Sequence, residues 1–242
     1  MVVQRHVGQR SDRRAFTLVE LLVAVFILGI LLSGLAALTS GFLGFSRQVS
    51  VINDRLADLN DAMGYVSLTA RSSMLVYGQA GLERDVEFAT DAPFTCSVQD
   101  ATRPCIAFVV PSVERASGAI TGFDFVAYAV RPLSEWARNP GVPGGWDQDD
   151  TPVLLEYRAE LCSPCATPPV VDSASAVVMT RESLVIANLI LEDEAGVAYA
   201  PFTVGAGASR ITVQLRTRGS GVTDGVQVPS RGVLTQLVVR RP

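Results

Sequence analysis

The residues with the widest chemical possibilities in this sequence are its four cysteines, Cys96, Cys105, Cys162 and Cys165. Cysteine thiolates can exchange disulfides, bind zinc or form structural cross-links. The last two have the spacing of a redox motif, but they lie in a proline-rich loop, whereas a thioredoxin-type site lies at a helix N-terminus. Only this pair has the short spacing of zinc ligands. An even number of cysteines therefore favours disulfides, most simply Cys96–Cys105 and Cys162–Cys165, over a zinc site, redox catalysis or free thiols.

Histidine chemistry has little support, because the chain has a single histidine, His6, close to its N-terminus. A Ser-His-Asp or Cys-His unit needs a histidine beside the nucleophile, and the body of this chain has none. We therefore predict that the protein is not an enzyme and uses no cofactor.

An acidic cluster follows Trp146 and contains Asp147, Asp149 and Asp150. Calcium binds such carboxylate oxygens, but the segment lacks the pattern of an EF-hand loop. A solvated loop is the favoured interpretation, and no metal site is predicted.

The charge balance argues against a general nucleic-acid-binding protein. The net charge is −4, and residues 1–15 carry +3 from four arginines and Asp12, which leaves −7 on the rest. Nucleic-acid binding is driven by basic surface. Some arginines fall together near the C-terminus: Arg210, Arg216, Arg218, Arg240 and Arg241. We interpret them as a solvated strand face or a contact with another subunit, with DNA capture as the alternative.

An uncharged apolar run from Leu21 to Ser46 is long enough to cross a bilayer as a helix. The arginines precede it, so the positive-inside rule places the N-terminus in the cytoplasm and the rest of the chain on the exported side. A secretory signal is the alternative, with small residues imitating a cleavage site at Ser33, Gly34, Ala36 and Ala37. We favour a retained helix, because the apolar run continues to Phe45 and no proline occurs before Pro93.

The segment from Arg13 to Glu20 reads Arg-Arg-Ala-Phe-Thr-Leu-Val-Glu and places a carboxylate at the edge of the apolar run. It resembles the class III signal of type IV prepilins and type II secretion pseudopilins. In that family Gly, or less often Ala, precedes Phe-Thr-Leu-(Ile/Val)-Glu; here the residue is Ala15. The resemblance implies cleavage between Ala15 and Phe16 by a prepilin peptidase and N-methylation of Phe16, with Arg13 and Arg14 supplying the leader charge.

The resemblance also implies a role for Glu20 in assembly. A carboxylate among apolar helices is costly without a partner. The new terminal ammonium of a neighbouring subunit, or of the same chain, would supply one and set the axial register between subunits. An ordinary membrane anchor with an incidental glutamate is the alternative.

Beyond Phe45 the apolar residues recur at intervals of three and four, which predicts an amphipathic continuation of the helix. They are Val49, Ile52, Leu56, Leu59, Met63, Val66 and Ala70. The helix is predicted from Phe16 to about Tyr77, ending near Gly78 and Gly81. Packing on a globular domain is favoured over a coiled-coil dimer, because the stripe spans only about three heptads.

The remaining chain has short β-type runs separated by turns, which predicts an α+β fold of one long helix packed on an antiparallel sheet. The predicted strands are Ile106–Val110, Phe123–Arg131, Val153–Leu161, Leu184–Leu191, Arg210–Arg218 and Val233–Arg240. Within Arg210–Arg218 the alternation indicates a half-buried strand. Segments 125–130, 152–158, 183–196, 210–215 and 230–241 resemble W-type minor pilins and the J-type pseudopilin, which implies the type IV pilin fold.

Together these features predict a minor type IV pilin that primes or tips a pilus. Its parts are a leader at 1–15, a transmembrane and assembly helix at 16–45, its amphipathic continuation at 46–77 and an exported domain at 78–242. The implied partners are prepilin peptidase, other pilins, the inner membrane and its assembly platform; after assembly the protein would lie in the pilus or at the cell surface. The alternatives are a J-type pseudopilin and a membrane-anchored DNA- or surface-binding protein.

Overall fold

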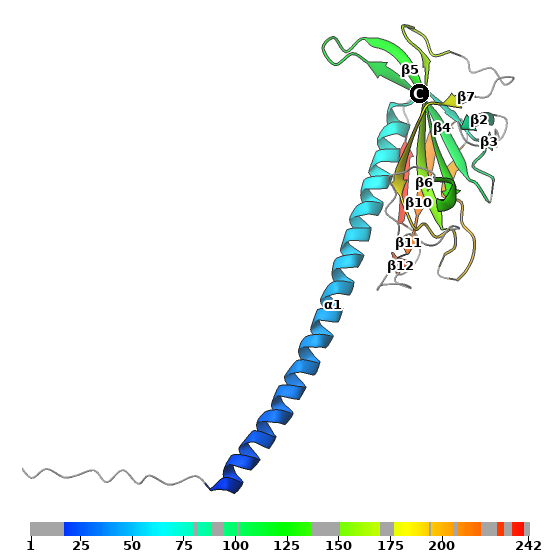
Figure 1. Cartoon of the computed structure of the whole chain (residues 1–242). Coiled ribbons are helices and arrows are strands. Elements are labelled where there is room, and N and C mark those ends of the chain that lie inside the picture. Colours follow the sequence, from blue (N-terminus) through cyan, green and yellow to red (C-terminus); the bar gives the residue numbers. More distant parts are fainter. Residues whose placement is uncertain are drawn as a thin grey trace, which may run out of the picture. The chain divides into compact units, whose positions relative to one another are not determined.

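The computed structural model describes residues 17–79, 82–88, 94–100, 102–136, 151–169, 177–193, 195–205, 208–218, 227–229 and 234–239. The chain divides into two compact units, residues 1–49 and 50–242 (Figure 1). The expected α+β arrangement is confirmed, because the second unit packs helical residues on antiparallel sheets. Several predicted positions lie outside the described residues: Arg13, Arg14, Ala15, Phe16, Asp147, Asp149, Asp150, Arg240 and Arg241.

The helix α1 runs from Leu18 to Ser72, so it begins two residues later than predicted. Its first part lies in the first unit and exposes its apolar side chains on every face, from Leu18 to Phe45. Among the described residues, α1 is the one helix that is long and apolar enough to cross a membrane. Such exposure in an isolated chain requires lipid or other helices around this segment.

The second part of α1 buries one face in the second unit, as the periodic stripe predicted. Leu59, Met63, Val66 and Ala70 are buried in the main core, and Ile52 and Leu56 pack against it. The stripe therefore begins at Ile52, because Val49 remains exposed.

The predicted end of the helix near Tyr77 is wrong by five residues. Residues Leu75–Tyr77 form strand β1, which pairs antiparallel with β4 (Cys105–Val113). The amide of Met74 already donates to the carbonyl of Val109 at 2.8 Å. Gly78 does adopt the left-handed conformation, with φ of +103°, but it follows this strand rather than the helix. Pairing with a distant strand has outweighed the local helical pattern.

The central sheet has the order β1-β4-β5-β6-β8, and every neighbouring pair is antiparallel. Strand β5 spans Ile120–Pro132, β6 spans Pro152–Cys162 and β8 spans Arg181–Ile186. The sheet is buried on both faces: Phe108, Val126 and Leu154 join the core that contains α1, whereas Val109 and Phe125 join a second core. Double burial explains the nearly continuous apolar runs in these strands.

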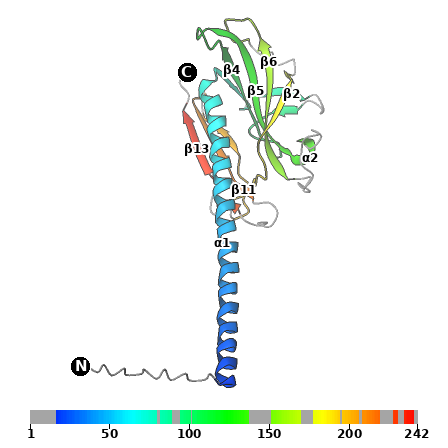
Figure 2. The same cartoon turned by 60° about the vertical axis from the view of Figure 1, so that its left-hand side comes forward.

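A second sheet, of order β13-β10-β9, completes the core around α1. It contains β9 (Phe202–Val204), β10 (Arg210–Leu215) and β13 (Leu234–Val239). Figure 2 shows β13 beside the C-terminal half of α1, and buried residues of both share one core. The predicted alternation of β10 is confirmed, because its apolar residues Ile211, Val213 and Leu215 are all fully buried.

The strand predicted as Arg210–Arg218 is broken at Arg216, and β11 (Thr217–Arg218) pairs separately with β12 (Gln227–Val228). The strand predicted as Leu184–Leu191 ends at Ile186, because Asn188 turns the backbone with φ of +56°.

The second core is covered by elements that the sequence patterns did not predict. These are β2 (Arg84–Phe88), β3 (Phe94–Cys96), β7 (Val177–Met179) and the short helix α2 (Leu133–Trp136). The order of this sheet is β3-β2-β7, with β2 and β7 parallel.

Candidate functional site

Glu20 lies in the first turn of α1 and forms a capping box with Thr17. The Thr17 amide donates to Oε2 of Glu20 at 3.0 Å, and the Thr17 hydroxyl donates to the same oxygen at 3.1 Å. In return, the Glu20 amide donates to the Thr17 hydroxyl oxygen at 3.3 Å. A reciprocal pair of this kind satisfies amides that have no partner within the helix. Thr-x-x-Glu before an apolar run is the usual sequence form of a capping box, so Thr17 and Glu20 carried a local signal that was not used to predict the start of the helix.

The capping box holds the Glu20 carboxylate beside an apolar hollow. Glu20, Leu21, Ala24, Val25 and Leu28 line this hollow, whose volume is about 290 Å³. An anion at an apolar surface gains most from a cation that is itself withdrawn from water. The geometry therefore holds one carboxylate in a fixed position at the edge of an exposed apolar surface.

Four glycines in the first unit leave the surface of α1 open. A Cβ atom added to Gly29, Gly34, Gly41 or Gly44 would meet nothing within 4 Å. The packing of this chain alone therefore does not require glycine at these positions. Small residues on an apolar helix allow a second helix to approach its backbone closely, so this surface suits helix–helix assembly.

A polar centre lies between α1 and the central sheet in the second unit. The buried carboxylate of Glu156 accepts hydrogen bonds from the hydroxyls of Tyr128 at 2.8 Å and Tyr65 at 3.2 Å. Nε of Arg158 donates to Oε1 of Glu156 at 2.6 Å, and Nη2 of Arg158 donates to the Tyr65 hydroxyl at 3.1 Å. The Thr69 and Tyr128 hydroxyls lie 2.8 Å apart. Every acceptor oxygen of Glu156 is thus satisfied, and these bonds join the helix to the sheet.

This environment shifts the pKa values of the groups around Glu156. Burial raises the pKa of Tyr128, and the Glu156 charge raises it further. Burial and the Glu156 charge likewise raise the pKa of Tyr65. Burial lowers the pKa of Arg158, but its hydrogen bond to Glu156 and the Glu156 charge raise it by more, so the guanidinium stays charged. The centre therefore consists of two neutral tyrosines and one ion pair, an arrangement that is typical of a structural support.

All four cysteines form disulfides, in the pairs that the spacing suggested. Cys96–Cys105 joins β3 to β4, with both residues fully buried. Cys162–Cys165 closes a short loop at the end of β6. No free thiol is left for zinc or for nucleophilic chemistry. Among the described residues no group of three or more His, Cys, Asp or Glu side chains is placed to hold a metal ion.

The prediction that Arg210, Arg216 and Arg218 lie on a solvated strand face is wrong for Arg216. Arg210 and Arg218 are exposed, but Arg216 is only 1% exposed. Its Nη1 donates to the Glu192 carbonyl at 3.2 Å and its Nε to the Pro229 carbonyl at 3.4 Å. A buried guanidinium that binds carbonyls of its own chain contributes nothing to a DNA-binding surface.

Comparison with known proteins gives one match. A family model described as the prokaryotic N-terminal methylation motif matches residues 10–36. Comparisons with curated proteins and with solved structures found no match. The matched motif supports a structural subunit of the type IV pilin or pseudopilin kind, which a prepilin peptidase processes and which assembles with other pilins. An apolar N-terminal helix fits membrane anchoring of such a subunit with an exported C-terminal domain.

Proposed function

We propose that this protein is a minor type IV pilin, a structural subunit that primes or tips a pilus. One observation carries the proposal. The methylation motif at residues 10–36 overlaps the first part of α1, where the apolar side chains are exposed on all sides and the first turn holds one positioned carboxylate. A domain of this size suits a tip subunit better than a densely repeated shaft subunit.

In the proposed mechanism the peptidase cleaves between Ala15 and Phe16, and Phe16 becomes N-methylated. Arg13 and Arg14 keep the leader at the cytoplasmic face of the inner membrane. The helix then leaves the bilayer sideways into a bundle of similar helices. Glu20 of one subunit pairs with the terminal ammonium of the next, which fixes the axial register in a medium of low dielectric constant.

The same geometry suits a J-type pseudopilin of type II secretion, which is the second candidate. The two assignments share the cleavage, the methylation and the role of Glu20. They differ in the filament that contains the protein. Deletion of the chain separates them, because loss of surface pili supports the first and loss of enzyme secretion with normal pili supports the second.

The test of the shared mechanism starts with the intact mass and N-terminal sequence of the protein from cell envelopes. The expected chain starts at methylated Phe16. A start beyond Ser33 would show ordinary secretory cleavage and would overturn the proposal. An intact Met1 would leave only a membrane anchor, and would equally overturn it.

Substitutions at Glu20 then test the register. Glu20→Gln keeps the size of the side chain and an oxygen that can accept the Thr17 hydrogen bonds, but it removes the charge. We expect this variant to be cleaved and membrane-inserted yet absent from filaments, as for Glu20→Ala. Incorporation of Glu20→Gln at the normal level would show that the charge does not set the register.

A further inference from the structure

Strand β8 is an open edge of the central sheet. Among the described strands it has one neighbour, β6, and it pairs with that strand from Arg181 to Ile186, with a register shift at Val185 between Leu184 and Ile186. Its outer side therefore presents backbone amides and carbonyls that no described strand pairs with. Such edges accept a further strand readily unless they are covered or blunted.

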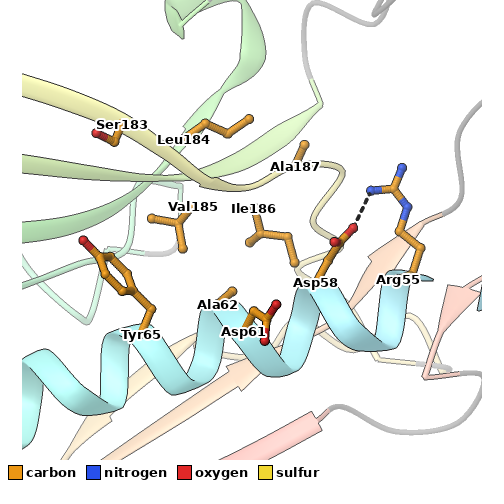
Figure 3. A pocket seen from close by; sticks show the side chains of 10 residues that line it. All are labelled: Arg55, Asp58, Asp61, Ala62, Tyr65, Ser183, Leu184, Val185, Ile186 and Ala187. Carbon is orange, nitrogen blue, oxygen red and sulfur yellow. Dashed lines mark hydrogen bonds and ion pairs between the residues drawn. The ribbon is translucent and has the colours of Figure 1, made fainter. Parts of the chain in front are cut away.

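A groove of about 510 Å³ separates this edge from α1 (Figure 3). Ser183, Leu184, Val185, Ile186 and Ala187 all line it. One face of a strand would contribute only alternate residues. Four consecutive residues of β8 and the residue that follows the strand therefore show that β8 lines the groove with its edge, so backbone groups are within reach of an occupant.

The opposite wall of the groove is acidic. Asp58 and Asp61 project from α1 into it, together with Arg55, Ala62 and Tyr65. Nη1 of Arg55 lies 3.4 Å from Oδ2 of Asp58 and offsets part of that charge. Asp61 is exposed and makes no ion pair or hydrogen bond with the part of the chain that the structure describes. A cation on the occupant is therefore the complement of this wall.

We propose that the groove binds an extended segment of a neighbouring exported subunit, which adds to β8 as a further strand and places an arginine or lysine against Asp61. The idea of a neighbouring subunit rests on the proposed pilin function; the strand addition and the charge rest on β8 and Asp61. Backbone hydrogen bonds to β8 supply affinity in this mode of binding, and the side chains of the added strand supply specificity. The six residues of β8 set the length of the recognised segment.

The test uses the full chain in detergent micelles and a synthetic hexapeptide of alternating valine and threonine with one arginine. Fluorescence anisotropy of the labelled peptide measures affinity, and hydrogen exchange measures protection of the β8 amides. We expect binding with slowed exchange in Arg181–Ile186. Replacing the peptide arginine with glutamate, or introducing Asp61→Arg, should weaken binding at least about tenfold.

Asp54→Arg is the matched control, because Asp54 is exposed on the same helix but does not line the groove. It should weaken binding clearly less than Asp61→Arg does, because Asp54 lies two helical turns from Asp61, roughly 10 Å, which is about the screening length at physiological salt. Equal losses of affinity from Asp54→Arg and Asp61→Arg would show that the peptide is attracted only by the overall negative charge of the helix, and would overturn the proposal.

The peptide itself tests strand addition without any risk to folding. N-methylation of the amides along one edge of the peptide removes the donors that face β8, whereas methylation along the other edge leaves them. One methylated peptide should therefore bind and the other should not. Binding of both, or binding without protection of β8, would overturn strand addition.

Two further outcomes separate this proposal from the pilin assignment. If the β8 amides become more protected from exchange as the protein concentration rises, with no peptide present, the groove binds a second copy of this chain. That result would overturn the proposal that a segment of a different subunit binds there. Absent peptide binding in a chain that starts at methylated Phe16 would overturn strand addition and leave the proposed function intact. Peptide binding by a chain processed beyond Ser33 would support the groove and remove the pilin assignment.

Discussion

Tyr128 and Glu156 are direct partners across β5 and β6, and the Tyr128 hydroxyl donates to Oε2 of Glu156 at 2.8 Å. Glu156 is only 4% exposed, on the face of the sheet that packs against α1. A buried carboxylate is expensive unless each oxygen has a donor. Tyr128 therefore allows a charge to lie between the helix and the sheet.

Tyr128→Phe removes this donor and is expected to lower the free energy of unfolding by about 1–3 kcal/mol, because one carboxylate oxygen stays buried without its bond. Urea unfolding of the full chain in micelles, followed by tryptophan fluorescence, measures the change. Tyr65→Phe is the control and should cost less, because Tyr65 is exposed to water that can replace its hydrogen bond. A larger loss for Tyr65→Phe would contradict this account.

Buried tyrosines predict loss of stability in alkali. Burial raises the pKa of Tyr128 and Tyr157 above the unfolded value of 10.0, and the charges of Glu156 and Glu182, respectively, add to the effect. The folded state then holds more protons than the unfolded state above pH 10.0. Stability should be complete below that pH and should fall as pH rises toward the folded pKa, by about 1.4 kcal/mol per pH unit for each tyrosine.

Unfolding free energies measured across this range check the prediction, with tyrosinate absorbance as a second readout. Tyr128→Phe should reduce the slope by about one such contribution. A slope that Tyr128→Phe leaves unchanged would show that Tyr128 ionises equally easily in both states.

The disulfides are expected to differ in their contributions. Replacing both Cys96 and Cys105 with serine should cost about 2–4 kcal/mol, because it frees a loop between β3 and β4 and buries two hydroxyls. The matched double variant at Cys162 and Cys165 should cost less, because that loop is shorter and its cysteines are partly exposed. Unfolding in oxidising buffer compares the two, and the reverse order would contradict the argument.

The elements that were predicted from sequence are those with a strong local pattern. The stripe from Ile52 to Ala70 and the alternation in Arg210–Leu215 follow the helical and strand periods. The apolar residues of β10 and of the stripe from Leu59 onward are buried as expected, and Ile52 and Leu56 pack at the edge of the same core. Short elements such as β2 and β7 carry little pattern of their own. They form because they cover a face of the central sheet that is built elsewhere in the chain.

The candidate sites likewise differ in whether a local sequence pattern marks them. Glu20 stood out because a carboxylate interrupts an apolar run in a single short segment. The polar centre did not, because Tyr65 and Glu156 are 91 residues apart and only the packing of α1 on the sheet brings them together. Its local sign is the pair of opposite charges Glu156 and Arg158 in the otherwise mostly apolar strand Pro152–Cys162. Arg216 was misplaced because a local alternation does not reveal that the strand stops at Leu215.

The guanidinium of Arg216 is buried and donates to two carbonyls, those of Glu192 and Pro229. Arg216→Ala should cost about 3–5 kcal/mol, since it leaves a cavity and removes both charge-assisted bonds. Arg216→Met fills most of the space without a charge, and should recover at least half of that loss, because a well-packed apolar chain avoids the desolvation of a cation. Thermal unfolding of both variants in micelles shows whether the filled volume or the hydrogen bonds of Arg216 contribute more to stability. Equal losses would show that the two hydrogen bonds, rather than the filled volume, hold these segments together.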